Sequence, residues 1–251
     1  MGSAFELGSI RPANEEWKPQ KILLYGPQGL GKTTFGATFE APILARTEDG
    51  AGAIDVPTFP EVCKTFGDLE AVINALHGEH PFKTAVIDSL DWMEPIIWAQ
   101  TCAINDQESI EAFGYGKGYL EADTQWRYIM GGLDSLRLNK GMCIVIIAHA
   151  EVKNYASPEV DPYDRYQIKL HKSASALIRE HSDIVGFCNY QTSIVKTEVG
   201  FNKKVARGTG SGARYMFLEE RPAFQAKNRY GLPERIDQIT GGVGKLQSFL
   251  R

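Results

Sequence analysis

A glycine-rich loop follows an apolar stretch near the start of this 251-residue chain. Residues 21–25 read Lys-Ile-Leu-Leu-Tyr, and residues 26–33 then match the pattern G-x-x-x-x-G-K-T. Glycines let the backbone turn its N–H groups inward around an anion, and a helix beginning near Lys32 directs its positive end at the same point. The pattern therefore predicts a strand, a phosphate-binding loop and a helix that together hold a nucleoside triphosphate such as ATP.

The polar residues of this loop and one distant carboxylate have expected tasks at the phosphates. We expect Lys32 to reach the β- and γ-phosphates and the Thr33 hydroxyl to ligate Mg²⁺. Asp88 ends a second apolar stretch and is expected to hold the same ion; the alternative is an Asp that only caps the next helix. The residues expected to contact the nucleotide are Gly26, Pro27, Gln28, Gly29, Leu30, Gly31, Lys32, Thr33 and Thr34.

Apolar stretches alternate with amphipathic ones along most of the chain. Strands are expected at 21–25, 42–46, 84–88, 142–148, 183–188 and 213–218, and helices at 32–39, 68–77, 92–103 and 119–138. This alternation predicts an α/β fold with a mostly parallel central sheet and helices on both faces. Residues 1–19 are expected to form a lead-in segment and residues 20–251 one domain, in which glycine-rich 208–212 forms a loop or hairpin tip.

Composition limits the partners and the cellular setting. Residues 1–100 hold 7 Lys and Arg against 14 Asp and Glu, whereas residues 101–251 hold 20 against 17, within a net charge of −4. An excess of positive charge is therefore available in the second half, for example at Arg207 and Arg214, although a solvated charged face is the default interpretation of such a run. With no apolar run near 18 residues and no basic leader, we expect no membrane span or signal peptide. The four dispersed cysteines suggest reduced thiols rather than a zinc site.

Two further residues at expected strand ends are candidates for catalysis. Residue 89 is Ser, so the chain lacks the Asp-Glu pair with which many ATPases position the attacking water. Glu48, after the second strand, is the best candidate for a general base, with Asp49 or a solvated turn as alternatives. His149 follows the most apolar strand and is expected to sense the γ-phosphate, unless the backbone alone satisfies it.

Taken together, the loop, Glu48, the Asp88-Ser89 pair and a polar residue after the next strand resemble the RecA-like branch of P-loop ATPases. More narrowly, residues 114–119, 147–150 and 226–233 resemble bacteriophage RecA-like ATPases, which include core-only recombinases and single-strand annealing proteins. The likeness covers about residues 20–240. It implies a Mg²⁺-dependent, DNA-stimulated ATPase in the cytoplasm of a bacterial host, acting on single-stranded DNA in phage recombination or strand annealing.

The same resemblance implies a homo-oligomer, a ring or a filament, with ATP between subunits. Lys227 and Arg229 would then reach the neighbouring subunit's ATP, where positive charge stabilises phosphoryl transfer; the alternative is a basic surface turn before Pro233. A single-stranded-DNA-binding protein is a further expected partner, because the chain has no room for separate DNA-binding domains. Strand annealing therefore fits better than autonomous strand exchange.

In the RecA family, loops after the third strand and after the strand that carries the sensor face the DNA. By analogy these are the regions 108–119 and 151–175, and aromatic residues mixed with basic ones suit single-stranded DNA. The expected DNA contacts are Tyr115, Lys117, Lys153, Arg165, Lys169, Lys172, Lys203 and Lys204. Two other functions stay open: a hexameric motor or helicase-loader ATPase, and a nucleotide-gated assembly module that hydrolyses little ATP.

Overall fold

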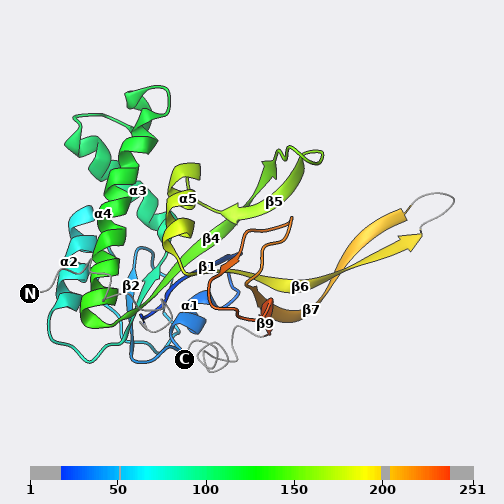
Figure 1. Cartoon of the computed structure of the whole chain (residues 1–251), viewed down its shortest axis with the longest axis horizontal. Helices are drawn as coiled ribbons and strands as arrows, with labels where there is room; N and C mark the ends of the chain where they lie inside the picture. The colour runs from blue at the N-terminus through cyan, green and yellow to red at the C-terminus, as the bar shows by residue number, and fades with distance from the viewer. Residues whose placement is uncertain (1–17, 51, 199–203, 238–251) are drawn as a thin grey trace, which may run out of the picture.

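The computed structural model describes residues 18–50, 52–198 and 204–237 (Figure 1). The expected lead-in segment, apart from its last two residues, and the end of the expected domain lie outside these ranges. The elements in chain order are β1 (Lys21–Gly26), α1 (Lys32–Gly36), β2 (Pro42–Arg46), α2 (Phe66–His77), β3 (Thr84–Asp88), α3 (Leu90–Ile104), the 3₁₀ helix η3 (Ile110–Phe113), α4 (Lys117–Lys140), β4 (Cys143–Tyr155), β5 (Tyr163–Ile168), α5 (Lys172–His181), β6 (Ile184–Glu198), β7 (Lys204–Phe217), β8 (Lys227–Asn228) and β9 (Arg235–Asp237).

The central sheet has the order β2-β3-β4-β1-β6-β7-β9, with β5 paired to β4 and β8 paired to β6. The strands β2, β3, β4, β1 and β6 run parallel, and the later strands are antiparallel. The strand β4 lies between β1, which leads into the glycine-rich loop, and β3, which ends in Asp88. The predicted α/β class, with a mostly parallel central sheet, is confirmed.

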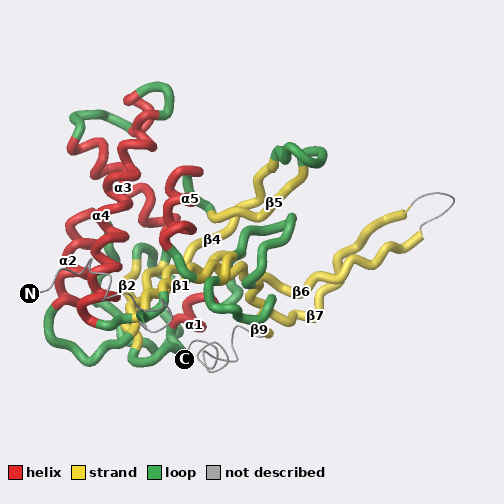
Figure 2. The backbone as a smooth tube through the Cα atoms, in the orientation of Figure 1, coloured by secondary structure: helices red, strands yellow, loops and turns green. Residues whose placement is uncertain are grey.

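Two apolar cores cover the two faces of the sheet, as Figure 2 shows by the helices on either side of the strands. Successive residues of β1 alternate between them: Leu23 and Tyr25 pack with α2, α3, α4 and α5, whereas Ile22 and Leu24 pack with α1. Trp126 of α4 is fully buried in the first core. Helices therefore lie on both faces, as predicted, but unequally: among the described residues, the five-residue α1 is the one helix on the second face.

Several expected elements have different bounds, and some were not expected. The helix α1 ends at Gly36, three residues earlier than predicted. The helix α2 begins at Phe66, because Thr65 caps it in a capping box with Asp68. The glycine-rich segment 208–212 lies within β7 rather than at a tip, since pairing with β6 supplies hydrogen bonds that composition cannot reveal. The strands β5, β8 and β9 lie in segments too polar or too short to show periodicity. The helix α5 was not predicted, although Ala174, Leu177 and Ile178 have the spacing of one helix face.

Two hairpins extend from the body of the sheet (Figure 1). The strand β4 continues past His149 to Tyr155 and pairs antiparallel with β5 from Tyr155↔Tyr163 to Ala150↔Ile168. The region 151–175, expected to be a DNA-facing loop, is therefore mostly a two-stranded ribbon followed by the start of α5. The second ribbon joins β6 and β7, and Lys203, one of the expected DNA contacts, lies outside the described residues.

The cysteines, the groups of metal-ligating residues and the lengths of the helices bear on three predictions made from composition. The four cysteines are free thiols, of which Cys63 and Cys188 are buried. In the described ranges, no group of three or more His, Cys, Asp or Glu side chains is placed to hold a metal. A helix long and apolar enough to cross a bilayer is likewise not found in those ranges.

Candidate nucleotide site

A cavity of about 420 Å³ opens where the parallel strands end. The glycine-rich loop follows β1, Glu48 follows β2, Asp88 ends β3, and His149 lies in β4 directly opposite Gly26. The sheet order thus gathers side chains that lie far apart in the sequence. The cavity is lined by Gln28, Gly29, Leu30, Gly31, Lys32, Thr33, Thr34, Glu48, Gly50, Ile54, Asp88, Ile147, His149 and Arg214.

The backbone of the loop depends on its glycines. Gly29 and Gly31 have φ of 74° and 86°, the left-handed region that side chains disfavour. At Gly26 the reason is space, since an added Cβ would lie 2.1 Å from the carbonyl oxygen of Cys188 in β6. The loop is therefore pressed against the neighbouring strand, and it lines the cavity up to the start of α1.

Lys32 lies at the floor of the cavity and is only 5% exposed. Its ammonium donates hydrogen bonds to the carbonyl oxygens of Gly26, at 3.0 Å, and Pro27, at 2.8 Å. Burial lowers the pKa of Lys32, and the nearby carboxylates oppose that shift. A phosphate group offers this ammonium a charged acceptor in place of two neutral carbonyls, which favours the bound state.

Thr33 and Asp88 are in direct contact, with the hydroxyl donating to the carboxylate at 2.6 Å. Burial raises the pKa of Asp88, while Thr33 and Lys32 oppose that rise. A partly buried hydroxyl and carboxylate side by side offer the oxygen ligands that Mg²⁺ prefers, and this ion is commonly held by one or two protein groups together with phosphates. The residues present fit a magnesium ion.

Glu48 faces the same cavity and is fixed by the chain that follows β3. The Ser89 hydroxyl donates to the Glu48 carboxylate at 3.1 Å. Thr47 locks these two loops together, because its buried hydroxyl donates to the Ser89 carbonyl at 2.6 Å and accepts from the Ser89 N–H at 2.8 Å. Asp49, the alternative base, is 90% exposed and pairs with Arg46, so it does not line the cavity.

His149 lines the cavity and is paired with Asp91, a residue that sequence reasoning missed. The Asp91 carboxylate contacts the His149 Nδ1 at 2.9 Å and accepts the His149 backbone N–H at 3.0 Å. Burial acts to raise the pKa of Asp91, but its hydrogen bonds with His149 outweigh that effect and lower it. Asp91 sits three residues after Asp88 in the first turn of α3, and this spacing was the available signal.

Lys227 and Arg229 lie at the opposite end of the sheet from this cavity. The strand β8 pairs with the first residues of β6, Ile184 and Val185. Ile184 is level with Ile22, four residues and about 13 Å before Gly26 along β1. Neither side chain is brought to the phosphate loop of its own chain, so any contact with ATP must be made to another subunit.

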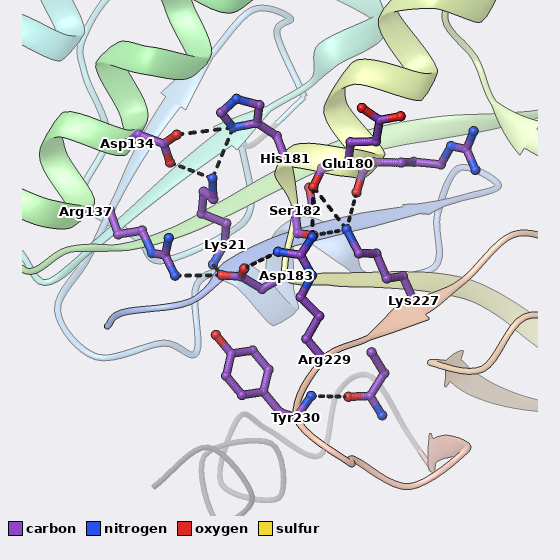
Figure 3. Close-up of polar contacts among 12 residues, drawn as sticks. Lys21, Asp134, Arg137, Glu180, His181, Ser182, Asp183, Lys227, Arg229 and Tyr230 are labelled. Atoms are coloured by element: carbon purple, nitrogen blue, oxygen red, sulfur yellow. Dashed lines mark hydrogen bonds and ion pairs between the residues drawn. The ribbon is translucent and has the colours of Figure 1, made fainter. Parts of the chain in front are cut away.

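The ammonium of Lys227 already donates all its hydrogen bonds within its own chain, as Figure 3 shows. Its ammonium donates to the carbonyl oxygens of Arg179 at 2.9 Å, Glu180 at 3.1 Å and Ser182 at 2.7 Å. These carbonyls end α5, where the last turn leaves acceptors without partners. Since an ammonium has three hydrogens, Lys227 has none left for a phosphate in this arrangement. The resemblance implied a finger role for Lys227, whereas in the structure Lys227 caps α5.

Arg229 differs from Lys227 because its side chain is 55% exposed. It contacts Asp183 at 3.3 Å and the Glu180 carbonyl at 3.4 Å, both at the margin of hydrogen bonding. Asp183 is held independently by Arg137, at 2.9 Å, and by the backbone N–H of Lys21, at 3.1 Å (Figure 3). Asp183 therefore keeps its partners if Arg229 turns away.

Replacing Lys227 with methionine is expected to lower the free energy of unfolding by about 2 kcal/mol, because α5 loses its C-terminal cap. Arg229→Ala is expected to cost less than about 1 kcal/mol, as an exposed ion pair contributes little. Urea denaturation followed by circular dichroism measures both. Equal losses from the two variants would contradict the distinction between a capping lysine and an exposed arginine.

One of the expected DNA contacts is wrong. The side chain of Arg165 is buried, its guanidinium pairs with Glu220 and donates to the Phe224 carbonyl at 3.1 Å, and it lies 5.1 Å from the ring centre of Tyr155. It joins the β4–β5 ribbon to the segment before β8. Side chains alternate between the two faces of a strand, so every second residue points inward. The region that contains Arg165 was expected to be a loop, and this alternation was therefore not applied to it.

The remaining expected DNA contacts that the structure describes with side chains are exposed. Tyr115 is fully exposed between two glycines, and all three residues have positive φ, which holds the ring away from the body. Lys153 pairs with Glu151 at 2.7 Å on the β4–β5 ribbon. The exposed basic residues of this set are Lys117, Lys153, Lys169 and Lys172. Lys204 begins β7, and its side chain is outside the description.

Comparison with known proteins gives one family match. A family model described as "AAA domain" matches residues 18–230, which is most of the chain. No curated protein matches. Among the matching solved structures is one titled "Crystal structure of the RadB recombinase", which has 13% identity and a TM-score of 0.45 over 83% of this chain and 84% of that one.

Proposed function

Because the chain belongs to the AAA domain family, we propose that it is a Mg²⁺-dependent ATPase of RecA-like type that acts on single-stranded DNA. Residues 20–251 would form one ATPase domain serving phage recombination or strand annealing. The observation that carries this proposal is the gathering of the glycine-rich loop, Glu48, Asp88 and His149 around one cavity. This set supplies a phosphate cradle, a base, a metal ligand and a γ-phosphate contact.

In the proposed reaction, Lys32 leaves its two carbonyl partners and binds the β- and γ-phosphates. Thr33 and Asp88 would hold Mg²⁺, which when bound neutralises charge on the phosphates. Glu48, oriented by the Ser89 hydroxyl, would take a proton from the water that attacks the γ-phosphate. The loop between β2 and α2 is tied to the one after β3 through Thr47, so this base keeps its position.

His149 would report the γ-phosphate to the DNA-facing ribbon. Its Nδ1 is occupied by Asp91, which leaves Nε2 for the phosphate. The strand β4 continues from His149 into the β4–β5 ribbon, and the His149 carbonyl accepts the Lys169 N–H at 2.9 Å after β5. His149 is thus part of β4 and accepts a hydrogen bond from the residue that follows β5, so it contacts both strands at the base of the ribbon. This arrangement supports coupling between ATP and DNA.

Arg229 would make ATP hydrolysis depend on the assembly of subunits. Its exposure, its marginal contacts and its distance from its own phosphate loop all suit a residue that serves the ATP of a neighbouring subunit. Hydrolysis would then depend on a ring or a filament. Lys227 would support this arginine indirectly, by fixing the end of α5 beside it.

Single-stranded DNA binding is tested through Lys169 and Lys172, both exposed at the base of the β4–β5 ribbon. Lys169→Ala with Lys172→Ala is expected to weaken binding of a fluorescent oligonucleotide several-fold at 50 mM salt. If both lysines contact phosphates, the slope of log K against log salt should fall by about 1.4. Fluorescence anisotropy titrations at several salt concentrations measure both quantities.

The matched control is Lys64→Ala with Lys83→Ala, which removes two exposed lysines elsewhere on the surface. This pair should leave the affinity within about twofold and the salt slope unchanged. An unchanged slope for the Lys169 and Lys172 variant, or equal binding of duplex and single-stranded DNA by the wild-type protein, would argue against the proposed DNA surface.

A further inference from the structure

The strand β7 brings a second cation to the phosphate cavity. Arg214 lines this cavity together with the glycine-rich loop, although it lies 184 positions after Leu30 in the chain. Sequence reasoning counted it only as part of the positive charge of the second half. The cavity also holds the carboxylates of Glu48 and Asp88, which repel a triphosphate, while the loop itself supplies one lysine.

Most of the N–H donors of the Arg214 guanidinium are not used in hydrogen bonds with the described residues. One nitrogen donates to the Leu30 carbonyl at 3.4 Å, near the limit for a hydrogen bond. The same group lies 5.9 Å from the ring centre of Tyr190, its partner in β6. Among the described residues no carboxylate pairs with Arg214, whereas Arg137 and Arg229 both contact Asp183. An arginine carries five N–H donors, so most of them can serve a bound anion.

The backbone beside Arg214 explains how a residue of a long ribbon reaches this cavity. The β6–β7 pairing is regular up to Tyr190↔Arg214 and resumes at Thr192↔Gly210, so β7 contains extra residues between these pairs. Gly212, within this irregularity, has φ of 73°. Bulges of this kind change the direction of a strand and of its side chains, and they recur next to active sites. The bulge separates the base of the ribbon, with Arg214, from its outer part.

We infer that Arg214 binds the phosphate chain of the nucleotide held by the glycine-rich loop of its own chain. This inference rests on the proposed function, since it requires that the cavity hold a nucleoside triphosphate. A charge-assisted bond to phosphate replaces the weak one to the Leu30 carbonyl, and two cations then face the triphosphate instead of one. The site would thus have an arginine in cis, from β7, as well as the proposed one in trans, Arg229, which follows β8.

The test is a titration with fluorescent N-methylanthraniloyl-ATP in the presence of Mg²⁺. Arg214→Ala is expected to weaken binding by about 10- to 100-fold, as expected for a lost bond to a charged group. Arg214→Gln keeps a donor for Leu30 but lacks the charge, and it should lose affinity to a similar degree. Arg214→Lys should recover part of it. Thermal unfolding without nucleotide should give the same midpoint for all three variants and the wild type.

The matched control is Arg235→Ala. Arg235 in β9 lies 4.6 Å from the ring centre of Tyr215, a contact like that of Arg214 with Tyr190, but it does not line the cavity. Its replacement should leave the affinity within about twofold. Lys32→Ala serves as the control for lost phosphate binding.

The possible results separate this inference from the proposed function. If the wild type binds the nucleotide, Lys32→Ala does not, and Arg214→Ala binds like the wild type, the inference is wrong and the proposed function stands. If Arg214→Ala lowers both stability and affinity while Arg214→Gln restores both, Arg214 only supports the loop, and the inference is again overturned. If the wild type itself does not bind nucleotide, the proposed function fails and the inference falls with it.

Discussion

Replacing Arg229 with alanine is expected to lower the ATP hydrolysis rate of the assembled protein by about a thousandfold, the lower end of the range for an arginine supplied from a neighbour. Nucleotide binding should persist, because the phosphate loop of the same chain is about 13 Å away along the sheet and intact. Stability should also persist, since Asp183 keeps Arg137 and the Lys21 N–H as partners. Phosphate release with saturating single-stranded DNA measures the rate.

Mixed assemblies test whether Arg229 acts in trans. Arg229→Ala subunits keep Lys32, and Lys32→Ala subunits keep Arg229, so a site is complete where the former holds the ATP and the latter supplies Arg229, and part of the activity should return on mixing. Mixing Arg214→Ala with Lys32→Ala should restore nothing, because both residues are expected to serve the same nucleotide. Arg221→Ala, which removes an exposed arginine paired with Glu234, is the control. Failure of the Arg229 mixture to recover would count against a trans arginine.

Replacing Glu48 with glutamine is expected to reduce ATP turnover by about 10²- to 10³-fold, because an amide cannot accept the proton of the attacking water. ATP affinity should change little. Glutamine can still accept the hydrogen bond from the Ser89 hydroxyl, which preserves the local geometry. Single-turnover hydrolysis and nucleotide titration measure the two quantities separately.

Asp49→Asn provides the matched control for Glu48→Gln. It removes the adjacent carboxylate, which is 90% exposed and does not line the cavity, and it should leave turnover within about twofold. If Glu48→Gln keeps full turnover, Glu48 is not the base. If the wild type binds ATP but shows no turnover even with DNA, the protein is a nucleotide-gated assembly module rather than an ATPase.

The nucleotide side of the site was predictable because its signals are local. Lys32 and Thr33 follow from the spacing of one loop, and Glu48, Asp88 and His149 each follow an apolar stretch recognisable by itself. Parallel strands place all their carboxyl ends at one edge, so recognising each strand was enough to bring these residues together. No long-range contact had to be known in advance.

The residues that were misassigned or missed depend on contacts with distant segments of the chain. The resemblance assigned Arg165 to DNA and Lys227 to the ATP of a neighbouring subunit, but the partners that occupy them come from distant segments, Glu220 for the first and the end of α5 for the second. Asp91 was overlooked because a helix start explains an Asp adequately. Its bond to His149 became visible only when β4 lay beside β3.

By itself the sequence determined that a phosphate loop follows a buried strand, that the fold is α/β, and which strand ends carry polar side chains. Glycine spacing and the period of apolar residues encode these features within short windows. Only the tertiary structure decided which cations are free to act: Lys227 is saturated by carbonyls, Arg229 is exposed, and Arg214 reaches the cavity from β7. The availability of a charged side chain depends on the partners that packing places around it, and those partners come from parts of the chain that no local pattern connects.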